Sequence, residues 1–103
     1  MIRHIVAVHF RAEVTDAQKA EIYDALRALS DHLPGILEFR SFANISPEEP
    51  VVRGFKDLFW IDFQGPDARD AYLVDPGHKA IGAKLVALAE GEIAGVQVLD
   101  VVV

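Results

Sequence analysis

Three segments of the chain are rich in the β-branched, aromatic and other apolar residues typical of β-strands, and their side chains alternate between two faces with a period of two. In the first segment, residues 2–10, one face carries Ile2, His4, Val6, Val8 and Phe10. In the third, residues 55–63, one face carries Phe55, Asp57, Phe59, Ile61 and Phe63, and the other carries Lys56, Leu58, Trp60 and Asp62. Residues 93–103 are almost entirely apolar and predict a last strand.

The second alternating segment, residues 36–45, has apolar residues at positions of both parities. Ile36 and Phe42 fall on one face, and we expect the other face to carry Leu37, Phe39, Ala43 and Ile45. Residues 44–54 contain two prolines and a pair of glutamates, which predicts a polar surface loop between two strands.

Two other regions have helical spacing. Thr15 and Gln18 fit a capping box, after which apolar residues recur every three or four positions until Pro34 and Gly35 end the helix. A short helix is predicted from Gly65 to Leu73. Another follows with Asp75 as its N-cap and Pro76 at its first position, and it ends near Gly91.

The predicted element order is β-α-β-β-α-β over residues 1–103, with no repeat and no linker. This order is typical of the ferredoxin-like α+β plan, in which both helices cover one face of an antiparallel sheet. We therefore expect a single domain of this class.

The sheet face away from the helices is the basis for predicting a homodimer. A face in contact with water normally carries polar residues, yet this one keeps Leu58, Trp60 and alternate residues of the last strand. A second copy of the same face is the simplest cover, because most oligomers are symmetric homodimers. The alternatives are that loops or a longer helix cover it, or that the predicted faces are shifted by one residue.

Charge and composition exclude several partners. The net charge of -6 argues against binding nucleic acid or an anionic membrane surface. The chain has no cysteine, so it has neither disulfides nor a thiolate metal site. No signal-peptide pattern and no apolar run of transmembrane length is present, and we expect a cytoplasmic protein.

His4 and Asp57 are the first candidates for chemistry. Both point toward the helices in the predicted sheet, and their two strands are neighbours in the ferredoxin-like order. A carboxylate beside an imidazole fixes the tautomer of the ring. The contact would serve either a ligand pocket or only the stability of the core.

Tyr72 and His78 flank the break between the two C-terminal helices. A helix N-terminus disfavours a protonated imidazole, so His78 is suited to act as a general base, and the Tyr72 hydroxyl would donate to a substrate carbonyl. Packing at a helix junction explains the two residues equally well. No close metal-ligand spacing and no phosphate-binding loop is present, and we expect neither a metal nor a cofactor.

Several motifs resemble the stress-responsive α/β-barrel (Dabb) family. They are Met1 to Val6, the Pro34-Gly35-Ile36 turn, Asn44-Ile45-Ser46, Arg53-Gly54-Phe55 and the stretch from Ala71 to His78. The resemblance spans nearly the whole chain and implies a ferredoxin-like dimer whose sheets face each other as a barrel.

The family includes a plant polyketide cyclase whose pocket lies between sheet and helices. The resemblance implies that Tyr72 and His78 are catalytic and that His4 lies in the pocket, together with Phe59, Ile61, Ile22 and Leu26. Asp57 stands where the cyclase has a histidine, and Phe59 and Ile61 are bulky where a long substrate needs space. These departures argue against a long-chain polyketide.

Three functional hypotheses follow. The first is a homodimeric module that binds a small apolar or carbonyl-containing ligand. The second is a cofactor-free enzyme in which His78 removes a proton next to a carbonyl and Tyr72 stabilises the enolate, as in an aldol cyclase. The third is a cofactor-free monooxygenase, because a related dimeric ferredoxin-like family performs that chemistry.

Overall fold

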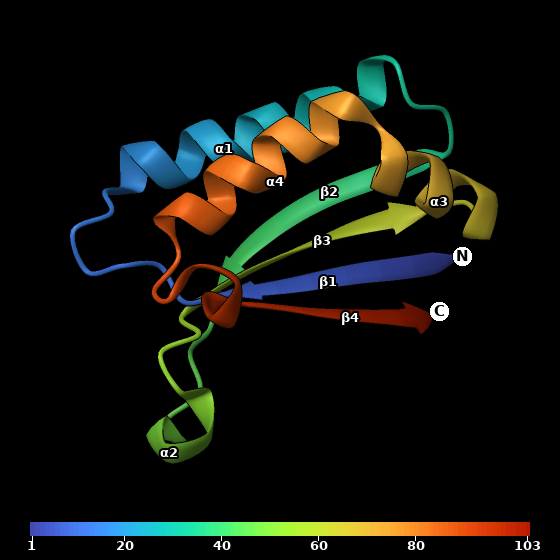
Figure 1. The fold of residues 1–103 in the computed structure, drawn as a ribbon. Coiled ribbons are helices and arrows are strands. Elements are labelled where there is room, and N and C mark those ends of the chain that lie inside the picture. Colours follow the sequence, from blue (N-terminus) through green and yellow to red (C-terminus); the bar gives the residue numbers. More distant parts are fainter.

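Four antiparallel strands form one sheet in the order β2-β3-β1-β4, and α1 and α4 cover one of its faces (Figure 1). The computed structural model describes residues 1–103. Its strands are β1 (Ile2–Val8), β2 (Ile36–Ala43), β3 (Asp57–Phe63) and β4 (Val96–Val102). Its helices are α1 (Asp16–Ala28), α2 (Glu49–Val52), α3 (Pro66–Val74) and α4 (Pro76–Leu88), with 3-10 turns at Leu29–Asp31 and Glu92–Gly95. The predicted β-α-β-β-α-β plan is confirmed.

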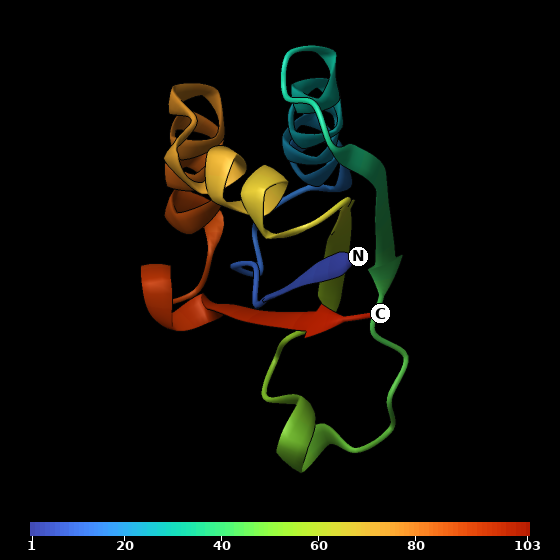
Figure 2. The same ribbon diagram turned by 90° about the vertical axis from the view of Figure 1, so that its right-hand side faces the viewer.

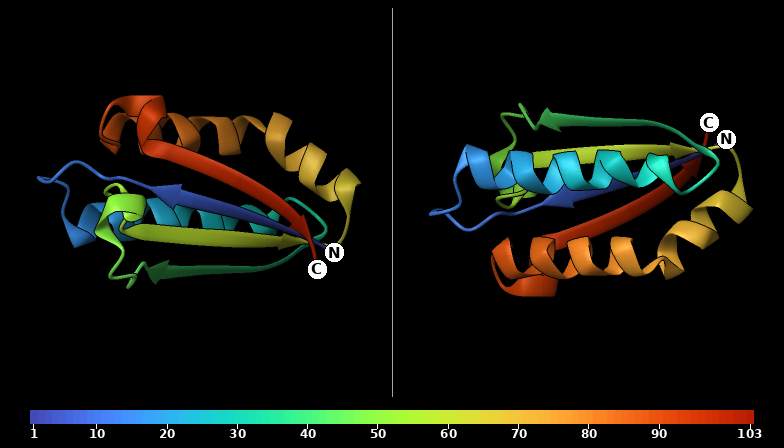
Figure 3. Two further views of the ribbon diagram at one scale, coloured as in Figure 1. Left: turned by 90° about the horizontal axis from the view of Figure 1, so that it is seen from below. Right: turned by 90° about the horizontal axis from the view of Figure 1, so that it is seen from above.

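The two long helices and α2 lie on opposite sides of the sheet. Figure 2 shows α1 and α4 together on one side, while the β2–β3 connection with α2 projects from the other. Seen from above, α1 lies over the middle of the sheet and α4 runs along β4 (Figure 3). None of the helices is both long and apolar enough to cross a membrane.

The core lies between the central strands and the helices. Buried side chains of β1 and β3 form its sheet side. On the helix side, α1 contributes Ile22 and Leu26, and α4 contributes Leu85. Thr15 caps α1 as predicted, since its hydroxyl accepts a hydrogen bond from the Gln18 amide at 3.2 Å. The Gln18 side chain accepts one from the Thr15 amide at 2.8 Å, which completes the capping box.

The predicted faces of β2 are wrong for Phe39, Phe42 and Ala43. A bulge at Leu37 shifts the register, so that Ile36 pairs with Phe63 but Glu38 pairs with Asp62. One extra residue inverts the parity of every later side chain. Phe39 therefore packs on the helix side, 5.5 Å from the Phe59 ring, and Phe42 lies on the other face, 4.7 Å from Trp60.

The last strand begins later than predicted. Residues Glu92–Gly95 form a 3-10 turn because Gly91 adopts a left-handed conformation with a φ of 71°. The His9 amide donates to the Gly95 carbonyl at 2.8 Å, and the Glu90 amide donates to the His9 carbonyl at 2.7 Å. These bonds hold the turn against the end of β1, so β4 runs only from Val96.

Candidate functional site

A cavity of about 220 Å³ opens between the helices and the β4 side of the sheet. Its walls are mostly aliphatic, and its polar side chains are His4, Tyr72 and His78. The remaining lining residues are Val6, Leu26, Phe59, Leu73, Ile81, Gly82, Leu85, Val86, Val96 and Val98. Such an apolar hollow with a few polar groups is typical of a small-molecule site.

The α3–α4 junction places Tyr72 and His78 side by side. Asp75 caps α4, because its carboxylate accepts a hydrogen bond from the His78 amide at 3.0 Å. The other oxygen of Asp75 lies 3.0 Å from Nε2 of His32. A Cβ at Gly77 would lie 2.9 Å from the Asp75 carboxylate, so glycine leaves room for this cap. The break between α3 and α4 brings the two rings together, and the ring centroids of Tyr72 and His78 lie 3.8 Å apart.

Burial sets the protonation of these two side chains. Desolvation, together with the nearby His4 imidazole, lowers the pKa of His78 below 6.5, although the Tyr72 backbone and Asp75 oppose the shift. Desolvation and the Asp100 carboxylate raise the pKa of the Tyr72 hydroxyl well above its usual value. Nδ1 of His78 is buried and has no hydrogen-bond partner. At neutral pH the site thus holds an uncharged imidazole beside a phenol that keeps its proton.

His4 enters the site from β1 and is held by Asp100 of β4. Nδ1 of His4 lies 2.6 Å from a carboxylate oxygen of Asp100, and the His4 ring lies edge-on to Tyr72 at 5.6 Å. Arg69 of α3 donates to the second Asp100 oxygen at 2.8 Å. Burial alone would raise the pKa of Asp100, but the hydrogen bonds from His4 and Arg69 outweigh it and lower the pKa.

The stress-responsive α/β-barrel (Dabb) domain model matches residues 2–103, which is almost the entire chain. The chain belongs to the Dabb family. No curated protein matches it. The resemblance inferred from the sequence motifs is therefore confirmed at the level of the family.

Solved structures similar to this Dabb protein share its fold. A dimeric ferredoxin-like protein of unknown function from Jannaschia sp. is 30% identical, with a TM-score of 0.87 over 99% of this chain and 98% of that one. A protein from Arabidopsis thaliana is 17% identical, with a TM-score of 0.86 over 100% and 95%. A hydroxynitrile lyase from Passiflora edulis is also 17% identical, with a TM-score of 0.80 over 99% and 92%.

The Dabb chain does not bring His4 and Asp57 together, so that expected contact is wrong. His4 pairs with Ile61 in the β1–β3 register, whereas Asp57 pairs with Val8. Four residues along a strand separate the two side chains by about 14 Å. Asp57 instead binds Nζ of Lys19 at 3.0 Å, at the other end of the sheet.

The other predicted pocket residues divide into two groups. Leu26 and Phe59 line the cavity of the Dabb domain with His4, Tyr72 and His78. Ile22 and Ile61 are buried in the core and do not line this cavity. No three His, Asp or Glu side chains lie close enough together to hold a metal ion.

Asp100 and Arg69 are the site residues that the sequence patterns did not reveal. Asp100 is the only charged residue between Val96 and Val103, and a lone carboxylate in an apolar strand was the available signal. Its contact with His4 depends on the β1–β4 register, which pairs the two residues directly. That register joins residues nearly a whole chain apart, and no local pattern specifies it.

Proposed function

We propose that this Dabb protein is a homodimer in which each protomer binds a small, mainly apolar molecule with a carbonyl group. The ligand occupies the cavity between α4 and the β4 side of the sheet. The observation that carries the proposal is an aliphatic cavity with the buried Tyr72 and the half-buried His78 side by side at its polar end.

The size and lining of the cavity support a compact ligand. A volume of about 220 Å³ is below the usual range for drug-sized ligands, roughly 300–1,000 Å³, and suits a molecule with one ring or a short chain. Leu26, Phe59 and Leu85 supply apolar contact. The phenol of Tyr72, which keeps its proton at neutral pH, supplies a donor for a carbonyl oxygen.

Exposed apolar side chains on the open face of the sheet support the homodimer. We define this open face by Ile5, Phe42, Leu58, Trp60, Leu99 and Val101. Leu99 is 51% exposed, Val101 is 41% exposed and Phe42 is 39% exposed. Exposed apolar side chains gathered on one sheet face favour an interaction surface, and a second copy of the same face is the simplest partner.

Acid–base catalysis is a second candidate function, favoured by the state of His78. Its imidazole is kept neutral by burial, and its Nδ1 has no partner in the protein. A neutral imidazole beside a hydroxyl donor can remove a proton next to a carbonyl while the hydroxyl stabilises the enolate oxygen.

Hydrogen–deuterium exchange at the methyl group of acetophenone, followed by NMR, tests this catalytic function. His78→Gln should slow protein-dependent exchange by about 10²-fold or more.

Thermal-shift titration with acetophenone tests the ligand proposal. Acetophenone should raise the Tm of the wild type, and Tyr72→Phe should weaken its binding by about tenfold, since one hydrogen bond is lost and the ring is kept. His78→Ala should also weaken it. His9→Ala, which lies outside the cavity, is the control and should bind like the wild type. Binding that is unchanged by both cavity substitutions would show that the ligand lies elsewhere.

A further inference from the structure

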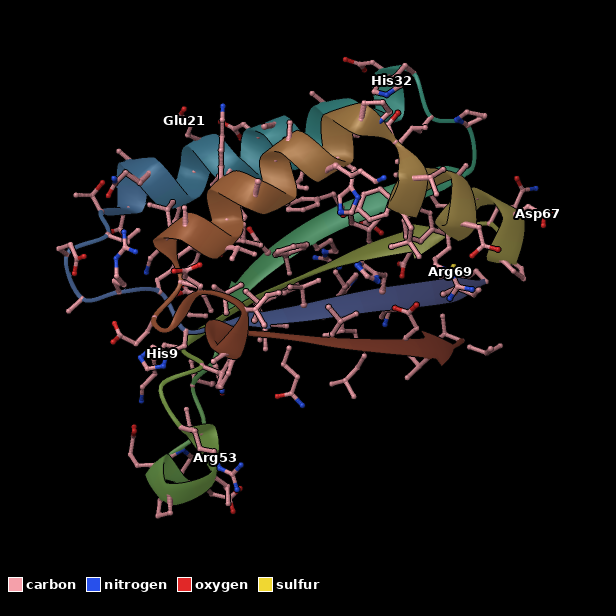
Figure 4. All side chains as sticks on the ribbon, viewed as in Figure 1. His9, Glu21, His32, Arg53, Asp67 and Arg69 are labelled. Atoms are coloured by element: carbon pink, nitrogen blue, oxygen red, sulfur yellow. The ribbon has the colours of Figure 1, made fainter.

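A chain of charged and polar side chains runs from the protein surface to the cavity. Nη1 of Arg69 donates to one oxygen of Asp100 at 2.8 Å, and the other oxygen lies 2.6 Å from Nδ1 of His4. The side chains of Arg69 and Asp100 are 25% and 29% exposed, whereas that of His4 is 6% exposed. Figure 4 shows Arg69 reaching from α3 toward the strands, while Asp67 of the same helix points away from them.

This arrangement determines which nitrogen of His4 carries the proton. An ionised carboxylate can only accept hydrogen bonds, and Arg69 keeps Asp100 ionised by holding its second oxygen. The 2.6 Å contact therefore requires a proton on Nδ1. In a neutral imidazole with Nδ1 protonated, Nε2 is left as an acceptor.

Nε2 of His4 makes no hydrogen bond with the protein. The only polar contact of the His4 ring is the one between Nδ1 and Asp100. Phe63 and Tyr72 pack edge-on against the ring, and His4 lines the cavity close to the Tyr72 and His78 pair. Nε2 is not among the buried side-chain atoms that lack a partner, so a ligand in the cavity that donates a hydrogen bond can reach this acceptor.

We propose that His4 presents an unprotonated Nε2 to the cavity, with Asp100 and Arg69 as positioning residues, and that the ligand carries a hydroxyl or enol group beside its carbonyl. The ligand class in this inference rests on the proposed function, and the state of His4 does not. Tyr72 donates a hydrogen bond to the carbonyl oxygen of the ligand, and His4 accepts one from its hydroxyl group. A hydroxycarbonyl compound therefore makes both hydrogen bonds, whereas a simple ketone makes only the one from Tyr72.

Nitrogen NMR of the histidine side chains tests the state of His4 without any ligand. The spectrum is recorded at mildly alkaline pH, where imidazoles are neutral, and the His4 signals are identified by their loss in His4→Gln. Nδ1 should carry the proton in the wild type. Asp100→Ala should shift the population toward the Nε2-protonated form, and Arg69→Met should shift it in the same direction by a smaller amount. A wild-type His4 protonated on Nε2 would overturn the proposal.

Asp70→Asn is the matched control for Arg69. Nε of Arg69 donates to Asp70 at 2.8 Å, so this substitution removes the other ion pair of the same guanidinium. The His4 tautomer should not change in Asp70→Asn. A change as large as that in Asp100→Ala would mean that general surface charge, and not the direct contact, sets the tautomer.

A pair of probes tests the ligand class. α-Hydroxyacetophenone and its methyl ether share a skeleton and a carbonyl, but only the first has a hydroxyl donor. The hydroxyl compound should bind the wild type about tenfold more tightly, and Asp100→Ala should reduce that preference. Equal affinities would overturn the proposed ligand class. If neither probe binds while Nδ1 carries the proton, the ligand class and the proposed function fail together, and the assignment of His4 stands.

Discussion

The lowered pKa of His78 predicts a component of the pH dependence of stability. Below pH 6.5 the unfolded chain binds a proton at this position, whereas the folded protein does not until the pH reaches the lower folded pKa. The free energy of unfolding should therefore fall as the pH falls below 6.5, and level off below the folded pKa. Urea unfolding across this range should show that His78→Gln lacks this component. A wild type and a variant with parallel pH profiles would contradict the burial argument.

Single residues of the site differ in how far the sequence predicts them. The placement of Tyr72 and His78 follows from local signals, because a helix break and an N-cap lie between them. The partner of His4 does not, since Asp57 was expected and Asp100 is found. Both carboxylates lie on strands next to β1, and only the register decides between them. Non-local pairing of this kind is the part of the site that periodicity cannot supply.

Helix α4 positions the site through its first turn. Asp75 is both the N-cap of α4 and the partner of His32, which follows the first helical segment. The N-cap and the proline after it were readable from the sequence, as was the capping box of α1. The bulge in β2 was not, because a single extra residue leaves no mark on composition and still inverts the face of Phe39 and Phe42.

Substitution of Asp75 tests the importance of this cap. Asp75→Ala removes the acceptor of the His78 amide and the partner of His32, so thermal unfolding should occur several degrees lower than in the wild type. Asp75→Asn keeps a good capping side chain without its charge and should lose less stability. Circular dichroism melts of the three proteins make the comparison. If Asp75→Ala melts with the wild type, α4 is not held by this contact.

At the scale of the whole molecule, the sheet separates two tasks. Its helix-covered face carries the cavity, and the open face defined above presents apolar side chains to solvent. The sequence predicted this two-sided character because Leu58 and Trp60 share one face of β3. The sequence pattern also placed Phe39 on the open face, which is wrong. The structure has Phe42 on that face, beside Trp60.

A charge placed on the open face should prevent dimerisation. Stable interfaces bury roughly 1,200–2,000 Å², and Leu99 lies within this face, where it pairs with Ile5. Leu99→Glu should be a folded monomer in analytical ultracentrifugation, under conditions where the wild type is a dimer. Val74→Glu adds the same charge at an exposed site on α3 and should stay dimeric. A monomeric wild type, or a dimeric Leu99→Glu, would contradict the assignment of the interface.

Amide NMR titration of the wild type with α-hydroxyacetophenone tests directly whether the cavity is the ligand site. The perturbed signals should belong to the cavity lining, with Gly82 of α4 and Val98 of β4 among the most shifted. Signals of the distant Lys19–Asp57 pair should stay in place. Shifts confined to the open face or to the β2–β3 connection with α2, with the cavity signals unchanged, would contradict a ligand site in the cavity.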